Sequence, residues 1–396
     1  MIAPHGAEDL TPLYVADDAQ RAALLEEAGG LTAIPVSSAA AASAVMLGSG
    51  YFTPLSGYMD LTQAHSVAEN MQLPSGLVWP VPVVNIVPAA RAAGLQVGQR
   101  VALLDPNVEG NPAIAVQEIT AIEAVSQEEQ TFLIEKTFGT TDPEHPGVAA
   151  FTAMGDTLLA GPIEVLNFSY FNTDFPETFR TAGQLRAEIA ERGWNKVVAF
   201  QTRNPMHRAH EELCRMAQQA VAADGILIHM LLGKLKPGDI PADVRDASIR
   251  KMVDVYFPAN TVIIAGYGFD MLYAGPREAV LHAIFRQNSG CSHLIVGRDH
   301  AGVGDYYGPF DAQSVFDDIP AGGLGIEIFR GDHTVWCNSC NEVVMMRDCP
   351  HGPDDYLFLS GTKVRDMLAA GEALPPEFAR PEVAQILMDF YQSEAS

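Results

Sequence analysis

A run of hydrogen-bond donors lies at residues 201–211, which read QTRNPMHRAHE and follow a short apolar stretch. Pro205 suits the first position of a helix, so the sequence predicts free N–H groups and a positive helix-dipole end here. His207 and His210 are three residues apart and would share one face of that helix. With an arginine and an asparagine just ahead, these donors are what binding a polyphosphate requires. An ordinary strand-to-helix turn with surface histidines is the alternative for the two histidines alone.

A second candidate segment, GRDHAG at residues 297–302, follows another short apolar run. Glycines at both ends allow a ligand to approach the backbone closely. Arg298 and His300 add donors, and the N–H of Ala301 can meet an anion directly. A turn with a surface Arg–Asp pair is the alternative for this segment taken alone. Two such segments on one sheet edge favour a ligand site.

Basic side chains also occur in two further loops. Lys234 and Lys236 belong to LLGKLKPGDIP, and Arg277 belongs to GPREA. Because the chain has only 24 lysines and arginines, this clustering predicts a locally positive pocket. Solvated surface charge is the alternative for each lysine taken singly.

The elements that must position these segments alternate between strand and helix from residue 196 onward. Apolar runs predict strands at 196–200, 225–232, 261–266, 293–297 and 325–330, with helices at 208–223, 242–257 and 276–287. Consecutive β–α units with continuous Val, Ile and Leu strands specify a parallel, doubly wound sheet with helices on both faces. Ligands of such sheets bind outside the carboxyl ends of the strands, which is where both donor segments fall.

The chain before residue 160 has a different pattern. Helices are expected at 17–28 and in the Ala/Ser-rich patch at 39–44, whereas short β-favouring runs begin at residues 78, 100, 112 and 131. Residues 158–181 are rich in Pro, Phe and Asn and are interpreted as a connector. This half is therefore predicted to be a compact, mostly β domain.

Charge and composition limit the classes of partner. The 396 residues include 24 Lys and Arg against 49 Asp and Glu, a formal net charge of −25. Such a chain repels polyanions, which argues against binding nucleic acid or anionic membranes. The N-terminus has no basic stretch followed by an apolar one, and the apolar runs are too short to span a bilayer. We expect a cytoplasmic protein with no nucleic-acid or membrane partner.

The late cysteines form a separate candidate site. Four soft ligands fall close together in the chain: Cys337, Cys340, Cys349 and His351. A C-x₂-C pair followed by a cysteine and a histidine predicts a closed, structural Zn²⁺ site. Only a proline separates the last two, so these two ligands are geometrically tight. Free cysteines in a reduced interior are the alternative, and Cys214 and Cys291 are interpreted as packing residues.

Several motifs together resemble one known family. QTRNPMHRAHE, KPGDIP, GPREA, GRDHAG and the late SGTKVRDML, in this order and spacing, are similar to the ATP sulfurylases, as is YFTPLSGYM at residues 51–59. The resemblance implies a β-rich PUA-like domain at 1–165, a doubly wound nucleotidylyltransferase domain at 166–330 and a C-terminal subdomain at 331–396. It also implies a homodimer, and the sequence contains no P-loop for a fused kinase.

The resemblance implies a role for each matching position. The implied catalytic residues are Thr202, Arg203 and Asn204. The implied sulfate ligands are Gln201, Arg203 and Ala301. The implied ATP-binding residues are Gln201, Thr202, Arg203, Asn204, His207, His210, Gly297, Arg298, Asp299, His300 and Val335. Mg²⁺ would arrive with ATP, and Zn²⁺ would be structural.

The chemistry expected of such residues is nucleotidyl transfer. Sulfate is fully ionised and needs no base, so the protein would align it against the α-phosphate of ATP and stabilise the charge on the departing pyrophosphate. The products would be adenosine 5′-phosphosulfate and pyrophosphate, and the reverse reaction would form ATP. Two other functions stay open: nucleotidyl transfer to another small anionic acceptor, and RNA recognition through the PUA-like domain.

Overall fold

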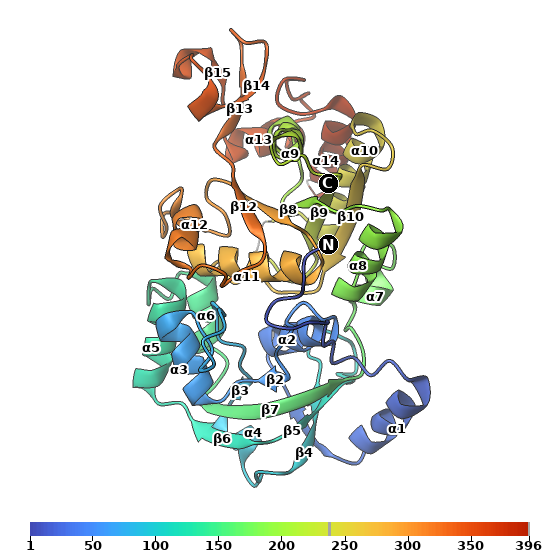
Figure 1. The fold of residues 1–396 in the computed structure, drawn as a ribbon, viewed down its shortest axis with the longest axis vertical. Coiled ribbons are helices and arrows are strands. Elements are labelled where there is room, and N and C mark those ends of the chain that lie inside the picture. Colours follow the sequence, from blue (N-terminus) through green and yellow to red (C-terminus); the bar gives the residue numbers. More distant parts are fainter. Residues whose placement is uncertain (237–238, 395–396) are drawn as a thin grey trace.

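The computed structural model describes residues 1–236 and 239–394, so Pro237 and Gly238 of the KPGDIP motif lie outside the described residues. The N-terminal half, the parallel sheet and the C-terminal elements follow one another along the long axis of the molecule (Figure 1). None of the described helices combines the length and apolar character needed to cross a membrane.

The N-terminal half is built around a mixed sheet in which most neighbours are antiparallel. Its strands are β1 (Thr32–Pro35), β2 (Gly57–Tyr58), β3 (Ile86–Val87), β4 (Arg100–Leu104), β5 (Ala113–Glu118), β6 (Ala121–Ala124) and β7 (Thr157–Val165). Its helices are α1 (Asp18–Ala28), α2 (Ser38–Gly48), α3 (Leu61–Asn70), α4 (Ala89–Ala92), α5 (Gln127–Phe138) and α6 (Pro146–Thr152). The predicted β-sheet of the first domain is confirmed, but six helices accompany it in the described part of this half, more than the stretches expected at 17–28 and 39–44.

Three local predictions in this half are wrong. The run beginning at residue 131 is helix α5, because Ser126 and Glu129 form a capping box and Gly139 ends the helix with φ of 68°.

The expected connector begins with β7, which pairs with β2, β3, β5 and β6 and so organises the sheet. Gly161 in that strand has φ of 140°, and a Cβ there would lie 1.9 Å from the Glu118 carbonyl oxygen, so this glycine permits close strand pairing. The run beginning at residue 78 contains two prolines and yields only β3.

The second half contains the predicted parallel sheet. Its strands are β8 (Val197–Thr202), β9 (Gly225–Leu231), β10 (Val262–Tyr267), β11 (His293–Val296) and β12 (Glu327–Arg330), in the spatial order β10-β9-β8-β11-β12. All neighbours are parallel. The connecting elements include α7 (Phe171–Asp174), α8 (Ala182–Glu191), α9 (Arg208–Ala220), α10 (Ala242–Tyr256), α11 (Pro276–Asn288) and α12 (Asp311–Ser314). The doubly wound prediction is confirmed, and the winding reverses between β8 and β11.

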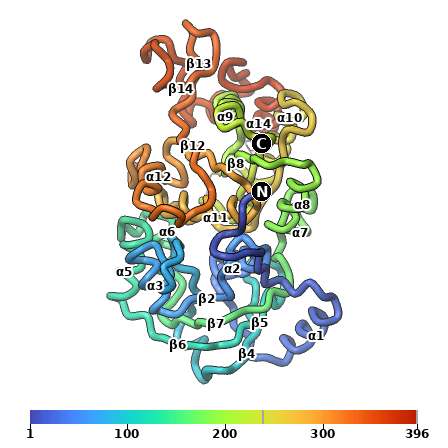
Figure 2. Tube along the Cα trace, in the orientation of Figure 1, coloured from blue at the N-terminus to red at the C-terminus, as the bar shows by residue number. Residues whose placement is uncertain are grey.

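The C-terminal elements lie beyond the carboxyl end of the parallel sheet (Figure 1). A small antiparallel sheet consists of β13 (Thr334–Cys337), β14 (Glu342–Met345) and β15 (Tyr356–Leu357), followed by α13 (Gly361–Ala369) and α14 (Pro381–Glu394). The tube view shows the N-terminal segment reaching up to the parallel sheet (Figure 2). There the His5 N–H donates to Asn288 Oδ1 at 2.8 Å, which fixes this segment to the end of α11.

Candidate active site

The two donor segments predicted from sequence meet at the reversal point of the sheet. The segment after β8 and the segment after β11 line one cavity of about 270 Å³. Predicted site residues in its wall are Gln201, Thr202, Arg203, Asn204, His207, His210, Gly297, Arg298, Asp299, His300 and Ala301. Val335 lies on β13 in an adjoining cavity of about 480 Å³, whose wall also includes Asn204, His207 and His210.

The turn after β8 differs from the predicted helix start. Helix α9 begins at Arg208 with His207 as its N-cap, so Pro205 precedes the helix and does not occupy its first turn. The Thr202 hydroxyl donates to the Asn204 carbonyl at 2.7 Å and accepts from the Asn204 N–H at 3.1 Å. This side-chain turn competes with helix formation and delays the first helical residue. The donors of residues 203 and 204 therefore project from a loop at the sheet edge.

A hydrogen bond fixes the tautomer of His210, and burial keeps both predicted histidines neutral. The His207 N–H donates to His210 Nδ1 at 3.3 Å, so a neutral His210 carries its proton on Nε2. Burial lowers the pKa of His210 to about 4 and lowers the pKa of His207 well below its usual value. Both rings are therefore neutral near pH 7, and His210 offers an N–H donor without a formal charge.

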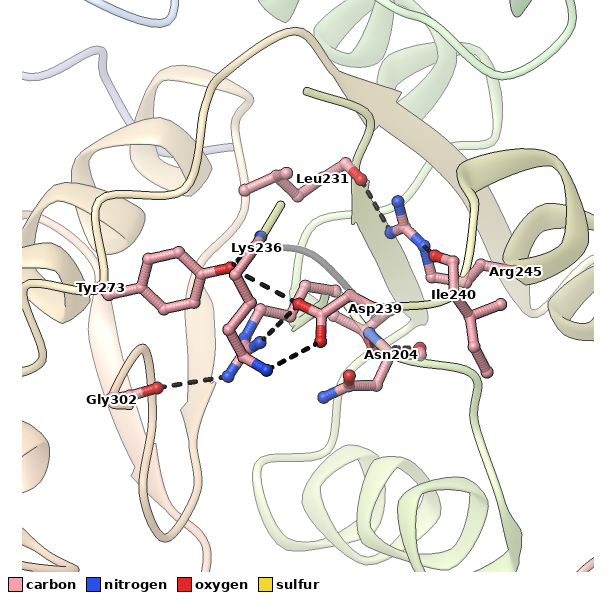
Figure 3. Close-up of polar contacts among 10 residues, drawn as sticks. Asn204, Leu231, Lys236, Asp239, Ile240, Arg245, Tyr273 and Gly302 are labelled. Carbon is pink, nitrogen blue, oxygen red and sulfur yellow. Dashed lines mark hydrogen bonds and ion pairs between the residues drawn. The ribbon is translucent and has the colours of Figure 1, made fainter. Parts of the chain in front are cut away.

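Groups from three separate loops hold Arg203. Figure 3 shows how these groups, Asp239, Tyr273 and Gly302, lie around one point. Its Nη1 lies 3.2 Å from Asp239 Oδ2, and its Nη2 donates to the Gly302 carbonyl at 3.2 Å. The guanidinium carbon lies 5.1 Å from the centre of the Tyr273 ring. Lys236 also pairs with Asp239, at 3.3 Å, so this carboxylate has two cationic partners. Asp239 and Tyr273 were not among the predicted site residues. Asp239 occurs in the quoted KPGDIP motif, but the motif does not indicate that its carboxylate pairs with Arg203.

The loop after β11 has a constrained backbone. Asp299 and Ala301 adopt φ of 55° and 57°, a conformation that L-residues with a side chain rarely occupy. A Cβ at Gly297 would meet no atom within 4 Å. This side of the loop is therefore open to a ligand. The loop is anchored where the Gly275 N–H donates to the Ala301 carbonyl at 3.1 Å.

Two of the three additional basic residues do not line these cavities. The Arg277 guanidinium donates to the carbonyls of Val67, Ala68 and Pro80, so it caps the end of α3 and links the two halves of the chain. The prediction that it belongs to a positive pocket is wrong. Lys234 is exposed, whereas Lys236 lines a cavity of about 410 Å³ together with Arg203, Arg298 and His300.

Comparison with known proteins settles the family. Residues 176–390 match the ATP-sulfurylase family model, and residues 2–168 match the PUA-like domain model. A sulfate adenylyltransferase of Alcanivorax borkumensis is 65% identical over 99% of this chain and 98% of its own length. This chain belongs to the ATP-sulfurylase family. Another sulfate adenylyltransferase, from Allochromatium vinosum, is 62% identical over 99% of both chains.

The ATP-sulfurylase fold is also present in a solved structure. A chain described as a hexameric APS kinase from Thiobacillus denitrificans superposes with a TM-score of 0.77 at 25% identity. The match covers 98% of this chain and 68% of that one. Family membership makes this chain an enzyme of the nucleotidyltransferase class, and the cavity between β8 and β11 is its candidate active site.

The C-terminal segment of this ATP sulfurylase packs against the turn that contains His207. Phe378 stacks on His207 with ring centres 4.8 Å apart, and the Arg208 N–H donates to the Phe378 carbonyl at 3.1 Å. Arg380 donates two hydrogen bonds to Glu211, at 2.9 and 2.8 Å. The Glu211 side chain is fully buried, so this ion pair joins α9 to the start of α14.

Removing the Glu211 charge should destabilise this contact. Two arginines pair with this carboxylate, Arg380 at 2.8 Å and Arg215 at 3.0 Å. Both lose their buried anionic partner in Glu211→Gln. We expect the free energy of unfolding to fall by about 3 kcal/mol in urea titrations. Glu188→Gln is the matched control, because its pair with Arg192 is partly exposed and should contribute about 0.5 kcal/mol or less. Equal effects of the two substitutions would contradict this account.

The late cysteines and histidine form a compact cluster. The ligand atoms of Cys337, Cys340, Cys349 and His351 all lie within 4.8 Å of one another. Cys349 Sγ is 3.8 Å from the other two sulfurs, and His351 Nδ1 is 3.3–3.6 Å from all three. Ligands about 2.3 Å from a tetrahedral zinc are roughly 3.8 Å apart, so the donor set fits a metal such as zinc.

Burial of histidines predicts a pH dependence of stability. The pKa is lowered by burial for His207, His210, His229, His282 and His300. Because the folded pKa lies below the unfolded value, this stability is complete above about pH 6.5 and is lost as the pH falls. Burial raises the pKa of Glu278 to about 7 and also raises the pKa of Asp270, so these carboxyl groups act in the opposite direction, but they are two groups against five. The thermal midpoint should be lower at about pH 5.5 than at pH 7.5, and an equal or higher midpoint would contradict this.

Proposed function

We propose that this ATP sulfurylase transfers the AMP moiety of ATP to sulfate by direct in-line attack on the α-phosphorus. The products are adenosine 5′-phosphosulfate and pyrophosphate, and no covalent enzyme intermediate forms. The observation that carries the proposal is the meeting of Arg203 with the 297–302 loop in one cavity. Cations and N–H donors around one small cavity suit a reaction that brings two anions together.

The sulfate end of the site is assigned to Gln201, Arg203 and the N–H of Ala301. Arg203 keeps donors free for an oxyanion, because among the described residues two of its nitrogens are bonded, one to Asp239 and one to Gly302. Sulfate needs no general base, since it is fully ionised. The role of these groups is to hold it in line with the α-phosphorus.

The nucleotide end is assigned to the turn after β8 and the loop after β11. His207 and His210, as neutral groups, contact the phosphates, and the stretch from Gly297 through Arg298 and Asp299 to His300 lines the nucleotide. Thr202, Arg203 and Asn204 are the catalytic residues, with Thr202 shaping the turn through its hydroxyl. Val335 is assigned to the adenine side because it lines the adjoining cavity.

Two metals are part of the proposal. Mg²⁺ enters with ATP and is held mainly by phosphates and water, because among the described residues the wall of the cavity contains two carboxylates, Asp299 and Asp332, and no larger acidic cluster. Zn²⁺ is held by the cysteine and histidine cluster, where it is structural and ties β13 to the segment 346–355.

The assembly and organisation are further parts of the proposal. We propose a cytoplasmic homodimer with divisions at 1–165, 166–330 and 331–396, supported by the ends of β7 and β12 at Val165 and Arg330. Light scattering of the purified protein tests the dimer. A sixfold mass, as in the description of the Thiobacillus structure, would contradict it.

Isotope exchange tests direct attack. Labelled pyrophosphate should enter ATP only when sulfate is present, because without an adenylyl-enzyme there is nothing for pyrophosphate to attack. Exchange without sulfate would contradict the proposal. The second candidate, another small anionic acceptor, is tested by replacing sulfate with other oxyanions and with phosphorylated vitamin precursors in the same assay.

A further inference from the structure

A row of buried polar side chains lies beneath the loop after β11. Glu278, His282 and Arg286 are spaced four residues apart on α11, so they share one face of the helix. All three are fully buried. Helix α11 lies between the parallel sheet and the N-terminal half (Figure 1), where solvent does not reach these groups. Neither the sequence motifs nor the proposed mechanism gives them a role.

The middle residue of this row contacts the site. His282 Nδ1 lies 3.0 Å from Nε2 of His300. His300 lines the cavities of about 270 and 410 Å³ at the end of the sheet. This contact requires one imidazole to donate and the other to accept. Because Nε2 of His300 is engaged below the loop, its Nδ1 edge is the one available to a ligand.

The carboxylate of Glu278 decides which ring donates. Its two oxygens accept the backbone N–H groups of Leu272 and Ala274, both at 3.1 Å, which fixes its position. Burial raises the pKa of this carboxyl to about 7 and the two hydrogen bonds oppose that shift, so the ionised form predominates above neutral pH. Its Oε1 lies 3.7 Å from His282 Nε2. At 3.7 Å the two atoms do not form a hydrogen bond, but a proton on His282 Nε2 is attracted by the ionised carboxylate, whereas a lone pair there would be repelled. His282 Nδ1 is then the acceptor, and His300 Nε2 is the donor.

The remaining charge around the row favours a neutral His282. The guanidinium carbon of Arg286 lies 4.8 Å from the centre of the Tyr267 ring. Within the described part of the chain, its Nε and Nη2 have no hydrogen-bond partner. This buried cation, together with burial itself, lowers the pKa of His282 and of His300, and Arg203 adds to the effect on His300. With both rings neutral, the tautomer set by Glu278 governs the contact.

We infer that Glu278 and His282 are positioning residues that fix the orientation and tautomer of His300 for nucleotide binding. The inference rests on the proposed function, in which the 297–300 stretch lines the nucleotide. Glu278 acts through His282, and neither residue touches the substrate. A loss of either should therefore act on ATP and leave the sulfate end of the site unchanged.

Two substitutions at one position separate this role from packing. Asparagine and leucine have nearly the same size, but only asparagine provides an acceptor in the place of His282 Nδ1. We expect His282→Leu to lower kcat/KM for ATP by roughly 10- to 100-fold, as for other orienting partners of histidines, with KM for sulfate unchanged. His282→Asn should keep most of the activity, and Glu278→Gln should show the ATP defect. Equal losses in the leucine and asparagine variants, or no loss in leucine, would overturn the inference.

A control and a reference variant complete the experiment. Glu327→Gln removes a carboxylate 3.5 Å from His293 Nε2, a Glu–His contact between β12 and β11, and should leave the kinetics unchanged. Arg203→Ala reports on the proposed site itself. If Arg203→Ala stays active, the proposed function fails. If it is inactive while His282→Leu behaves like the wild type, only the present inference fails.

Discussion

Arg203→Ala is expected to lower sulfate-dependent pyrophosphate release from ATP by about 10³-fold or more. Removing one well-placed neutral donor from an anion site commonly costs 10²–10³-fold in turnover, and Arg203 supplies a charge as well. The structure indicates that the protein tolerates the change. Asp239, which pairs with Arg203 at 3.2 Å, keeps Lys236 as a second cationic partner at 3.3 Å. No buried carboxylate is left without a partner, so the thermal midpoint should change little.

The control for Arg203→Ala is Arg192→Ala. Arg192 pairs with Glu188 on the surface of α8, away from both cavities, and its removal should leave the rate unchanged. Circular dichroism and thermal unfolding must first show that both variants are folded. Substantial activity in folded Arg203→Ala would contradict the assignment of the catalytic turn after β8.

The second large effect is expected at the cysteine cluster. Cys337→Ser removes a fully buried ligand at the end of β13, and the zinc content should fall from about one equivalent to near zero. The segment 346–355 would lose its tie to β13, so limited proteolysis should cut there first. Activity should fall too, because Thr334 and Val335 on the same strand line the two cavities.

Metal analysis of the wild-type protein decides this prediction. The sample must never have been exposed to chelator, and Cys214→Ser serves as the control because that cysteine is buried on α9 outside the cluster. Zinc near one equivalent is expected in the wild type and in the control. A wild-type protein without bound metal would contradict a structural zinc site.

The parallel half of the fold could be predicted because its strands are continuous apolar runs that are shorter than most helices. The N-terminal half was harder, since the apolar run in α5 was interpreted as a strand although the Ser126 and Glu129 capping box marks a helix. The strand β7 was missed because Gly161 and Pro162 in its middle suggest a break. Close pairing with neighbouring strands is what accommodates both residues, and pairing partners are not visible in a local pattern.

The same distinction applies to the site. The residues of the two donor segments could be predicted because each segment is contiguous and follows a strand. Contacts between distant parts of the chain could not be predicted: Asp239 against Arg203, Arg380 against Glu211, and His282 against His300. Arg277 shows the opposite error, because a basic residue in a promising motif was assigned to the pocket although it caps α3. Charge alone does not determine where a long side chain points.

The most direct test of the central claim is ATP formation from adenosine 5′-phosphosulfate and pyrophosphate with Mg²⁺. The purified protein, folded and with its metal content measured, should produce ATP rapidly and in proportion to the phosphosulfate consumed. The account predicts that omitting pyrophosphate stops the reaction, since pyrophosphate is the nucleophile in this direction. No ATP from the folded protein would contradict the assigned reaction and point to another acceptor for the same nucleotidyl-transfer site.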